Sequence, residues 1–260
     1  TIKENKTVSN YIHQYQNAPA FLDRYNAIIN LVNQKDTLAK QTVTTALSDK
    51  YWAIQNLAIS HYTDNEPTKT HLRKMLSHPH SSIRTASTNK LTAMNDTTIV
   101  ASIMNSLSNN TERSYSVMTS QIAALQALAP KSAIQIAEKL KGETYQGLVI
   151  ALGEIYAESG DIKHLPFFYK NANNVSGFYS SSFFEAQKSL LLKANETTIE
   201  THSEELSSIA HEDDYAWKRF HAAKVIYSLA NHLKEQNLYS DLVLKLERQI
   251  AIIKSEEQNA

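Results

Sequence analysis

Apolar and small residues recur along the chain with the spacing of a helical stripe. In the stretch Asp49 to Tyr62, DKYWAIQNLAISHY, Gln55 is followed by a small residue three positions later, Ala58, and by Tyr62 seven positions later. On an α-helix these three positions lie on one face. The same arrangement recurs about seven times, in the sets Arg24/Ala27/Leu31, Gln55/Ala58/Tyr62, Arg84/Ser87/Leu91, Met118/Gln121/Leu125, Leu148/Ala151/Ile155, Phe183/Ala186/Leu190 and Arg219/Ala222/Ile226.

The distance between successive sets indicates the architecture. Their first positions are 31, 29, 34, 30, 35 and 36 residues apart, which is the period of stacked helical hairpins. The small residue lets a neighbouring helix approach closely, and the residue at the third position fills the layer beneath. We therefore predict an all-α fold, a HEAT/armadillo-like right-handed α-solenoid of about seven helical hairpins.

We expect one domain over residues 1–260, with a repeat array over about 8–235 and an amphipathic capping helix over about 238–254. Only five Gly and five Pro are present, which is typical of a helical protein. The segment 161–179 interrupts the rhythm. We predict a short helix and a loop whose aromatic side chains fill a gap between layers, with a ligand-stacking surface as the alternative. These side chains are Phe167, Phe168, Tyr169, Phe178 and Tyr179.

Charge and cysteine content exclude several kinds of protein. Lys plus Arg equals Asp plus Glu at 26 each, so the chain has no global positive charge that would attract nucleic acid. The lack of Cys excludes disulfides and thiolate chemistry but fits any compartment. No apolar run approaches the roughly 20 residues of a membrane helix. A start at Thr1, without Met or signal peptide, indicates a piece of a longer protein.

The ten histidines do not form a metal-binding pattern. The sequence from His211 to Tyr215, HEDDY, begins like the His-Glu-x-x-His signature of zinc hydrolases but ends on Tyr, where the second ligand is required. We predict an acidic turn there. The His78-Pro79-His80 segment is interpreted as a connector between helices. We therefore predict no catalytic, cofactor-binding or metal-binding residue in this chain.

Three arginines are the candidates for contact with a peptide. Arg24, Arg84 and Arg219 all occupy the first position of a repeat set. The structural interpretation is that each guanidinium bonds to the acidic or polar turn of an adjoining repeat. The functional alternative is that these side chains line a groove and bind the carboxylate of a peptide.

Three segments of the first half resemble a known family. They are QYQNAPAFLDRYNAIINL (Gln14 to Leu31), ALSDKYWAIQNLAI (Ala46 to Ile59) and HPHSSIRTASTNKL (His78 to Leu91). Their Asp-Arg-Tyr-x-Ala, Asp-x-Tyr-Trp-x-Ile and Ser-x-Ile-Arg patterns resemble the HEAT-like C-terminal region of bacterial zinc aminopeptidases of the aminopeptidase N type. The second half is similar in repeat style alone.

The resemblance implies a non-catalytic domain of a gluzincin metallopeptidase. Such a domain packs on an upstream catalytic domain of the same polypeptide, which would hold the zinc, and bounds the chamber that receives peptide substrate. Neither the zinc signature nor the Gly-Ala-Met-Glu-Asn segment of the family occurs here, so no catalytic residue is carried onto this chain. The alternative is a free-standing HEAT-like scaffold that binds a protein or peptide partner in its concave groove.

Overall fold

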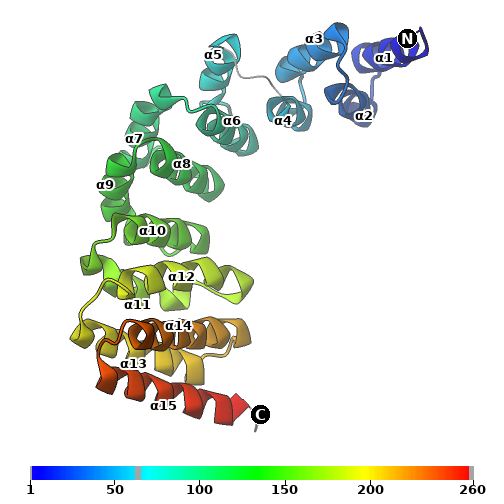
Figure 1. The fold of residues 1–260 in the computed structure, drawn as a ribbon. Coiled ribbons are helices and arrows are strands. Elements are labelled where there is room, and N and C mark those ends of the chain that lie inside the picture. Colours follow the sequence, from blue (N-terminus) through cyan, green and yellow to red (C-terminus); the bar gives the residue numbers. More distant parts are fainter. Residues whose placement is uncertain (1, 62–65, 258–260) are drawn as a thin grey trace. The chain divides into compact units, whose positions relative to one another are not determined.

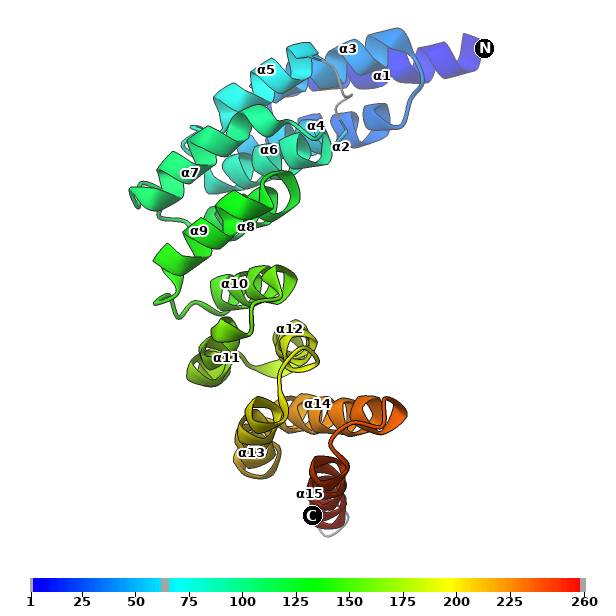
Figure 2. The same ribbon diagram turned by 60° about the vertical axis from the view of Figure 1, so that its left-hand side comes forward.

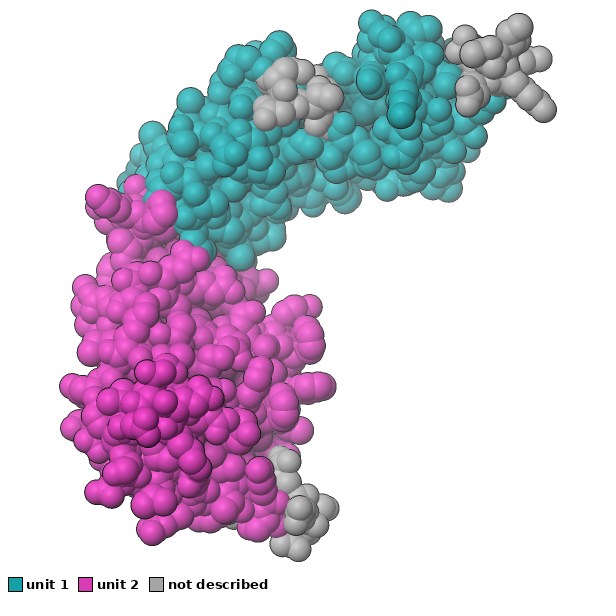
Figure 3. Space-filling model, in the orientation of Figure 1, with its two compact units in different colours: residues 1–129 teal, residues 130–260 magenta. Residues whose placement is uncertain are grey.

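The computed structural model describes residues 2–61 and 66–257, and in these ranges it contains fifteen α-helices and five short 3-10 helices but no β-strand. The predicted all-α, HEAT-like fold is therefore confirmed. The chain divides into two compact units, residues 1–129 and residues 130–260, coloured teal and magenta in Figure 3. The two units are described separately.

Unit 1 consists of four helical hairpins. The first helix of each hairpin is α1 (Ile2–Asn17), α3 (Thr37–Thr45), α5 (Glu66–Met75) or α7 (Val100–Ser108). The second helix is α2 (Phe21–Val32), α4 (Trp52–Ser60), α6 (Ser81–Ala93) or α8 (Tyr115–Leu128). Within the unit, α2, α4, α6 and α8 pack side by side in one layer (Figure 1 and Figure 2). The 3-10 helices η1 (Ala46–Ser48) and η2 (Thr97–Ile99) lie between helices.

Unit 2 continues the pattern with three hairpins and a last helix. The hairpins pair α9 (Pro130–Leu140) with α10 (Gln146–Ser159), α11 (Leu165–Asn171) with α12 (Ser180–Leu191), and α13 (Glu196–Glu212) with α14 (Ala216–Glu235). The last helix, α15 (Ser240–Glu257), packs on both α13 and α14. Three 3-10 helices flank α11, namely η3 (Ile162–His164), η4 (Ala172–Asn174) and η5 (Gly177–Tyr179).

The repeated stripe forms the core of both units. Every small residue at the second position of a set is buried, and so is every described residue at the third position. Tyr62, the third residue of the second set, lies outside the described residues. Because, within each unit, one face of a second helix packs on the next second helix, small residues are needed where the helix backbones approach most closely.

Some predicted boundaries and roles were wrong. Helix α1 begins at Ile2, earlier than the expected start of the array, and α15 continues to Glu257. Helix α13 runs through Glu212, so the HEDDY segment begins inside a helix and only its end forms a turn. In the interrupting segment, Phe168 is fully buried as predicted, but Phe178 and Tyr179 are 72% and 69% exposed and fill no gap.

Candidate functional site

The three candidate arginines hold the loop that precedes their own helix. Arg84 Nη1 donates to the main-chain oxygens of His78 (2.8 Å) and Pro79 (3.0 Å), and Arg24 Nη1 makes the same bond to Pro19 (3.3 Å). Arg219 Nη1 donates to the main-chain oxygen of Asp213 at 2.8 Å. The repeat therefore uses one arginine position to fix the turn within a hairpin.

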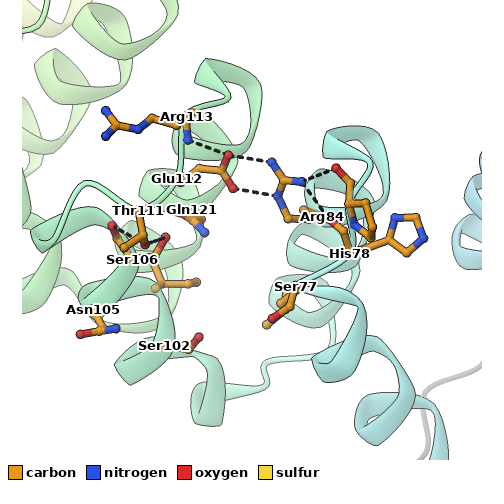
Figure 4. A pocket seen from close by; sticks show the side chains of 13 residues that line it. Ser77, His78, Arg84, Ser102, Asn105, Ser106, Thr111, Glu112, Arg113 and Gln121 are labelled. Carbon is orange, nitrogen blue, oxygen red and sulfur yellow. Dashed lines mark hydrogen bonds and ion pairs between the residues drawn. The ribbon is translucent and has the colours of Figure 1, made fainter.

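In unit 1 the same arginines also join one repeat to the next. Arg84 forms a two-pronged ion pair with Glu112, with Nη2 at 2.7 Å from Oε1 and Nε at 2.8 Å from Oε2 (Figure 4). Arg24 Nη2 lies 3.4 Å from Asp49 Oδ1. Burial alone would raise the pKa of Glu112, but hydrogen bonds from Arg84 and from the N–H of Ser114 hold it below its usual value. The structural role predicted for these residues is thus present, and their contact with a peptide stays a prediction.

A polar pocket of about 510 Å³ lies beside the Arg84–Glu112 pair (Figure 4). Hydroxyl and amide side chains from α7 and α8 line it, including Ser102, Asn105 and Gln121. Gln121 is 7% exposed, and its Oε1 atom has no hydrogen-bond partner within the described part of the chain. The Arg84 and Glu112 charges neutralise each other, and Arg113, which also lines the pocket, adds one positive charge.

The histidine segments do not assemble a metal site. His78 and His80 lie in the connector between α5 and α6, as predicted, and there each imidazole Nδ1 accepts a backbone N–H, from His80 and Ser82 respectively. Within residues 2–61 and 66–257 no group of three His, Asp or Glu side chains is arranged to hold a metal ion.

Aromatic rings at the start of each second helix form a pattern that the sequence reasoning missed. The ring stands at the residue before the helix or at its first residue, three or four positions before the first residue of the repeat set. An alignment of the seven sets extended by four residues would have revealed it. The rings belong to Phe21, Tyr51, His80 and Tyr115 in unit 1 and to Tyr145, Tyr179 and Tyr215 in unit 2.

In unit 1 these rings stack on one another. The centroids of Phe21 and Tyr51 are 4.0 Å apart, and those of Trp52 and His80 are 4.1 Å apart, with interplanar angles of 26° and 13°. Tyr51 and Trp52 join the two pairs at 6.4 Å. This ladder, Phe21–Tyr51–Trp52–His80, spans three consecutive hairpins, and its rings cover much of each other's faces.

In unit 2 one of these rings, Tyr179, belongs to an exposed aromatic cluster at the starts of α12 and α14. We call Phe178, Tyr179, Trp217 and Phe220 the aromatic surface; their exposed fractions run from 54% to 72%. Trp217 meets both Phe178 (6.3 Å) and Phe220 (6.2 Å) at nearly right angles, 83° and 88°. Trp217 also stacks on the His221 ring, with centroids 6.2 Å apart and an interplanar angle of 24°. Because all four side chains of the aromatic surface are nevertheless more than half exposed, the cluster presents a large apolar area to solvent.

A groove between α14 and α15 adjoins the aromatic surface through Phe220. It has a volume of about 330 Å³, and its walls are mainly apolar, with Tyr227, Ile250 and Ile253 beside Phe220. Two lysines also line it. Lys254 Nζ lies 5.8 Å from the Tyr227 ring centroid, and Lys224 Nζ lies 3.0 Å from Glu185.

Comparisons with known proteins return little sequence similarity. No family model matches the chain, and no curated protein matches it. A solved structure, the complex of CpcE and CpcF of phycocyanin lyase from Nostoc sp. PCC7120, aligns with 95% of this chain and 94% of the matched chain. The identity is 15% and the TM-score is 0.47, values at which no function is carried over.

The aminopeptidase assignment is wrong. The solved structure that aligns with the chain is a phycocyanin lyase complex, and neither a family model nor a curated protein links the chain to a zinc aminopeptidase, to hydrolase chemistry or to an upstream catalytic domain as its partner. The structure explains why the resemblance misled. Its shared residues are packing residues of a helical repeat: Ala27 and Ile54 are buried, and Arg24 and Arg84 form the contacts between repeats.

The described helices also include none long and apolar enough to cross a membrane.

Proposed function

We propose that the chain is a helical-repeat scaffold whose aromatic surface in unit 2 binds a protein partner. The observation that carries this proposal is the cluster of four aromatic side chains, each more than half exposed, on adjoining helix starts. Single exposed apolar residues are ordinary, but a contiguous patch is typical of interaction sites. Trp and Tyr are also the residues that contribute most to protein–protein affinity when a partner covers them.

The groove indicates the chemistry of the partner. Its apolar walls fit the aliphatic side chains of an amphipathic segment, and such segments commonly bind as a helix. Lys224 and Lys254 lie at the groove, and Glu185, which pairs with Lys224, also pairs with Lys188. Counting these four groups leaves an excess of two positive charges. The partner segment is therefore apolar on one face and acidic at its edges.

The experiment uses synthetic helical peptides that differ in charge alone. One carries leucines on one face with glutamates beside them, and the other has lysines in place of the glutamates. The chain contains two tryptophans, so the Trp52→Phe variant leaves Trp217 as the reporter of binding by fluorescence. We expect the acidic peptide to bind in the micromolar range and the basic peptide to bind at least tenfold more weakly.

Variants distinguish the aromatic surface from other exposed rings. In the Trp52→Phe background, Phe220→Ala should weaken the acidic peptide at least tenfold. Tyr169→Ala removes a ring of similar exposure on α11 and should leave the affinity unchanged. Equal binding of both peptides, or equal effects of both variants, would contradict the proposal. Dimerisation of the chain that Phe220→Ala abolishes would also contradict it, because a second copy would then be the occupant.

A further inference from the structure

A second pocket in unit 2 lies away from the aromatic surface, where α9, α10 and α11 meet. Its volume is about 330 Å³, and its walls include Glu138, Tyr156, His164 and Phe167. The Tyr156 ring stacks on the His164 imidazole, with centroids 4.2 Å apart and an interplanar angle of 19°. Phe167 meets Tyr156 edge-on at 4.9 Å. Two polar side chains are thus held in place by aromatic packing.

The local sequence explains why His164 lies under Tyr156. Gly160 ends α10 in the left-handed conformation, with a φ of 69°, which a residue without a Cβ adopts at little cost. The Asp161 side chain then accepts the N–H of Lys163 at 3.1 Å and starts η3. This tight turn reverses the chain and places His164, the last residue of η3, against the helix that has just ended.

Both buried side chains carry an unused hydrogen-bonding atom. Tyr156 is 1% exposed and His164 is 7% exposed. The His164 Nε2 atom is buried and has no hydrogen-bond partner among the residues that the structure describes. The Tyr156 hydroxyl is also buried without a partner at good hydrogen-bonding geometry, and burial together with the nearby Glu138 carboxylate raises its pKa. His164 Nδ1 lies 3.3 Å from Glu138 Oε1, so in the neutral ring Nδ1 carries the proton and Nε2 is an acceptor. Leaving two such atoms unpaired is costly for a core that serves stability alone.

The charges around these atoms favour an anion. Lys141, Lys163 and Lys170 line the pocket, against the single carboxylate of Glu138. Lys141 Nζ lies 3.4 Å from Glu138 Oε2, and Lys163 Nζ lies 2.6 Å from Asp161 Oδ2 at the rim of the pocket. Counting all five groups leaves one positive charge when His164 is neutral. Lys141 and Lys163 are long side chains that are 64% and 69% exposed, so they can move aside to admit a ligand while Glu138 stays beside His164.

We propose that this pocket binds a small molecule that carries a carboxylate on an apolar body. The carboxylate accepts the Tyr156 hydroxyl, and His164 takes up one proton from solvent, so that Nε2 donates to the ligand while Nδ1 donates to Glu138. The apolar body lies against Phe167 and Pro166. The imidazolium is then held between two carboxylates, an arrangement that offsets the cost of burying its charge.

The proposal predicts a defined dependence on pH. Burial lowers the pKa of His164 in the free chain, with Glu138 and Asp161 acting to raise it and Lys163 and Lys141 acting to lower it. Above pH 7 the imidazole of His164 in the free chain is therefore neutral, and the ligand binds together with one proton from solvent, whose concentration falls as the pH rises. Affinity falls as the pH rises from the pKa of His164 in the free chain toward its higher pKa in the complex, by up to tenfold for each pH unit between them.

The test uses benzoate as the probe and benzamide, its neutral analogue, as the charge control. Calorimetry should show benzoate binding at least tenfold more tightly at pH 6 than at pH 8, and NMR should show that benzoate raises the pKa of His164. Tyr156→Phe should weaken benzoate at least tenfold. Tyr169→Phe, which removes an exposed hydroxyl from α11, should leave binding unchanged.

Three results would overturn the proposal. These are benzamide binding as tightly as benzoate, an affinity that is the same at pH 6 and pH 8, and a His164 resonance, identified by its loss in His164→Gln, that benzoate does not move. The NMR measurement uses the unaltered chain, so it decides the question even if Tyr156→Phe fails to fold. The pocket is separate from the aromatic surface, and either proposal can fail without the other.

Discussion

Both units have aromatic rings near the starts of their second helices, and the rings are arranged differently in the two units. In unit 1, Phe21, Tyr51 and Trp52 are 37–39% exposed and belong to a ladder of nearly parallel rings. In unit 2, the four rings of the aromatic surface are 54–72% exposed and meet one another edge-on, while Trp217 also stacks on the buried His221. The stacked rings of the ladder cover part of one another's faces, whereas the rings of the aromatic surface keep more than half of their area exposed. The ladder is therefore expected to stabilise the contacts between repeats, and the aromatic surface is expected to bind a partner.

The arginines show the same contrast between the units. In unit 1 both Arg24 and Arg84 reach a carboxylate of the next repeat in addition to the preceding loop. In unit 2 Arg219 holds its loop through the main-chain oxygen of Asp213. Stacked rings and ion pairs thus both join adjacent repeats in unit 1. The repeated arginine position therefore joins adjacent repeats in unit 1 and serves its own hairpin in unit 2, where other side chains, such as Lys224 and Glu185, form the ion pairs between helices of different hairpins.

The largest expected effect follows from removal of the strongest link between repeats in unit 1. Glu112→Ala leaves the Arg84 guanidinium, 17% exposed, without its carboxylate and also removes acceptors for the N–H groups of Arg113 and Ser114. We expect a loss of about 3–5 kcal/mol in the free energy of unfolding, measured by urea denaturation. Glu66→Ala is the control, because Glu66 is 68% exposed and Arg73 keeps its bond to Asp96; it should cost under about 1 kcal/mol. Equal losses would contradict this interpretation.

A pair of tryptophan variants compares the two aromatic arrangements directly. Trp52→Ala removes a ring stacked between two others, and we expect a loss of about 2–3 kcal/mol in the free energy of unfolding. Trp217→Ala removes a ring that is 54% exposed, and we expect a loss below about 1 kcal/mol. Thermal and urea unfolding of both variants measure the difference. If Trp217→Ala is the more destabilising variant, the aromatic surface is structural.

Low pH should reduce the contribution of Glu112 to the free energy of unfolding over a defined pH range. The folded-state pKa of Glu112 lies below 4.5, its unperturbed value. Its stabilising effect is therefore fully present above pH 4.5 and is lost as the pH falls through the folded-state pKa. The difference in unfolding free energy between the unaltered chain and Glu112→Gln should be constant from pH 7 to about pH 5 and shrink below it. A difference that stays constant down to pH 3 would show that the carboxylate charge contributes nothing.

The fold was predictable because the repeat records a packing requirement in every hairpin. A small residue such as Ala58 and an apolar one such as Leu91 are needed at each helix contact, and this requirement appears at regular intervals in the sequence. The arginine contacts were predictable for the same reason. The end of α13 was not, because His211 and Glu212 suit either a turn or the last turn of a helix, and the packing of α13 on α14 decides.

The candidate sites were harder to predict, and the family assignment failed. Tyr156 and His164 are eight positions apart and carry no motif; a glycine turn and an aromatic stack bring them together. Phe168 and Phe178 belong to one aromatic-rich segment, yet one is buried and the other is 72% exposed. Patterns that reflect helix packing alone occur in unrelated proteins, so they identify a fold and do not identify a family.

The smallest expected effect on the free energy of unfolding concerns Phe178 in the aromatic surface of unit 2. Phe178 is 72% exposed and touches Tyr179 and Trp217 through ring edges, so Phe178→Ser should change the free energy of unfolding by no more than about 0.5 kcal/mol. The same variant should weaken binding of the acidic helical peptide by at least fivefold, because a covering partner would contact this ring. Urea denaturation and Trp217 fluorescence measure the two quantities on one sample. A loss of stability above about 1.5 kcal/mol would mean that Phe178 supports the fold, and unchanged peptide affinity would remove it from the binding site.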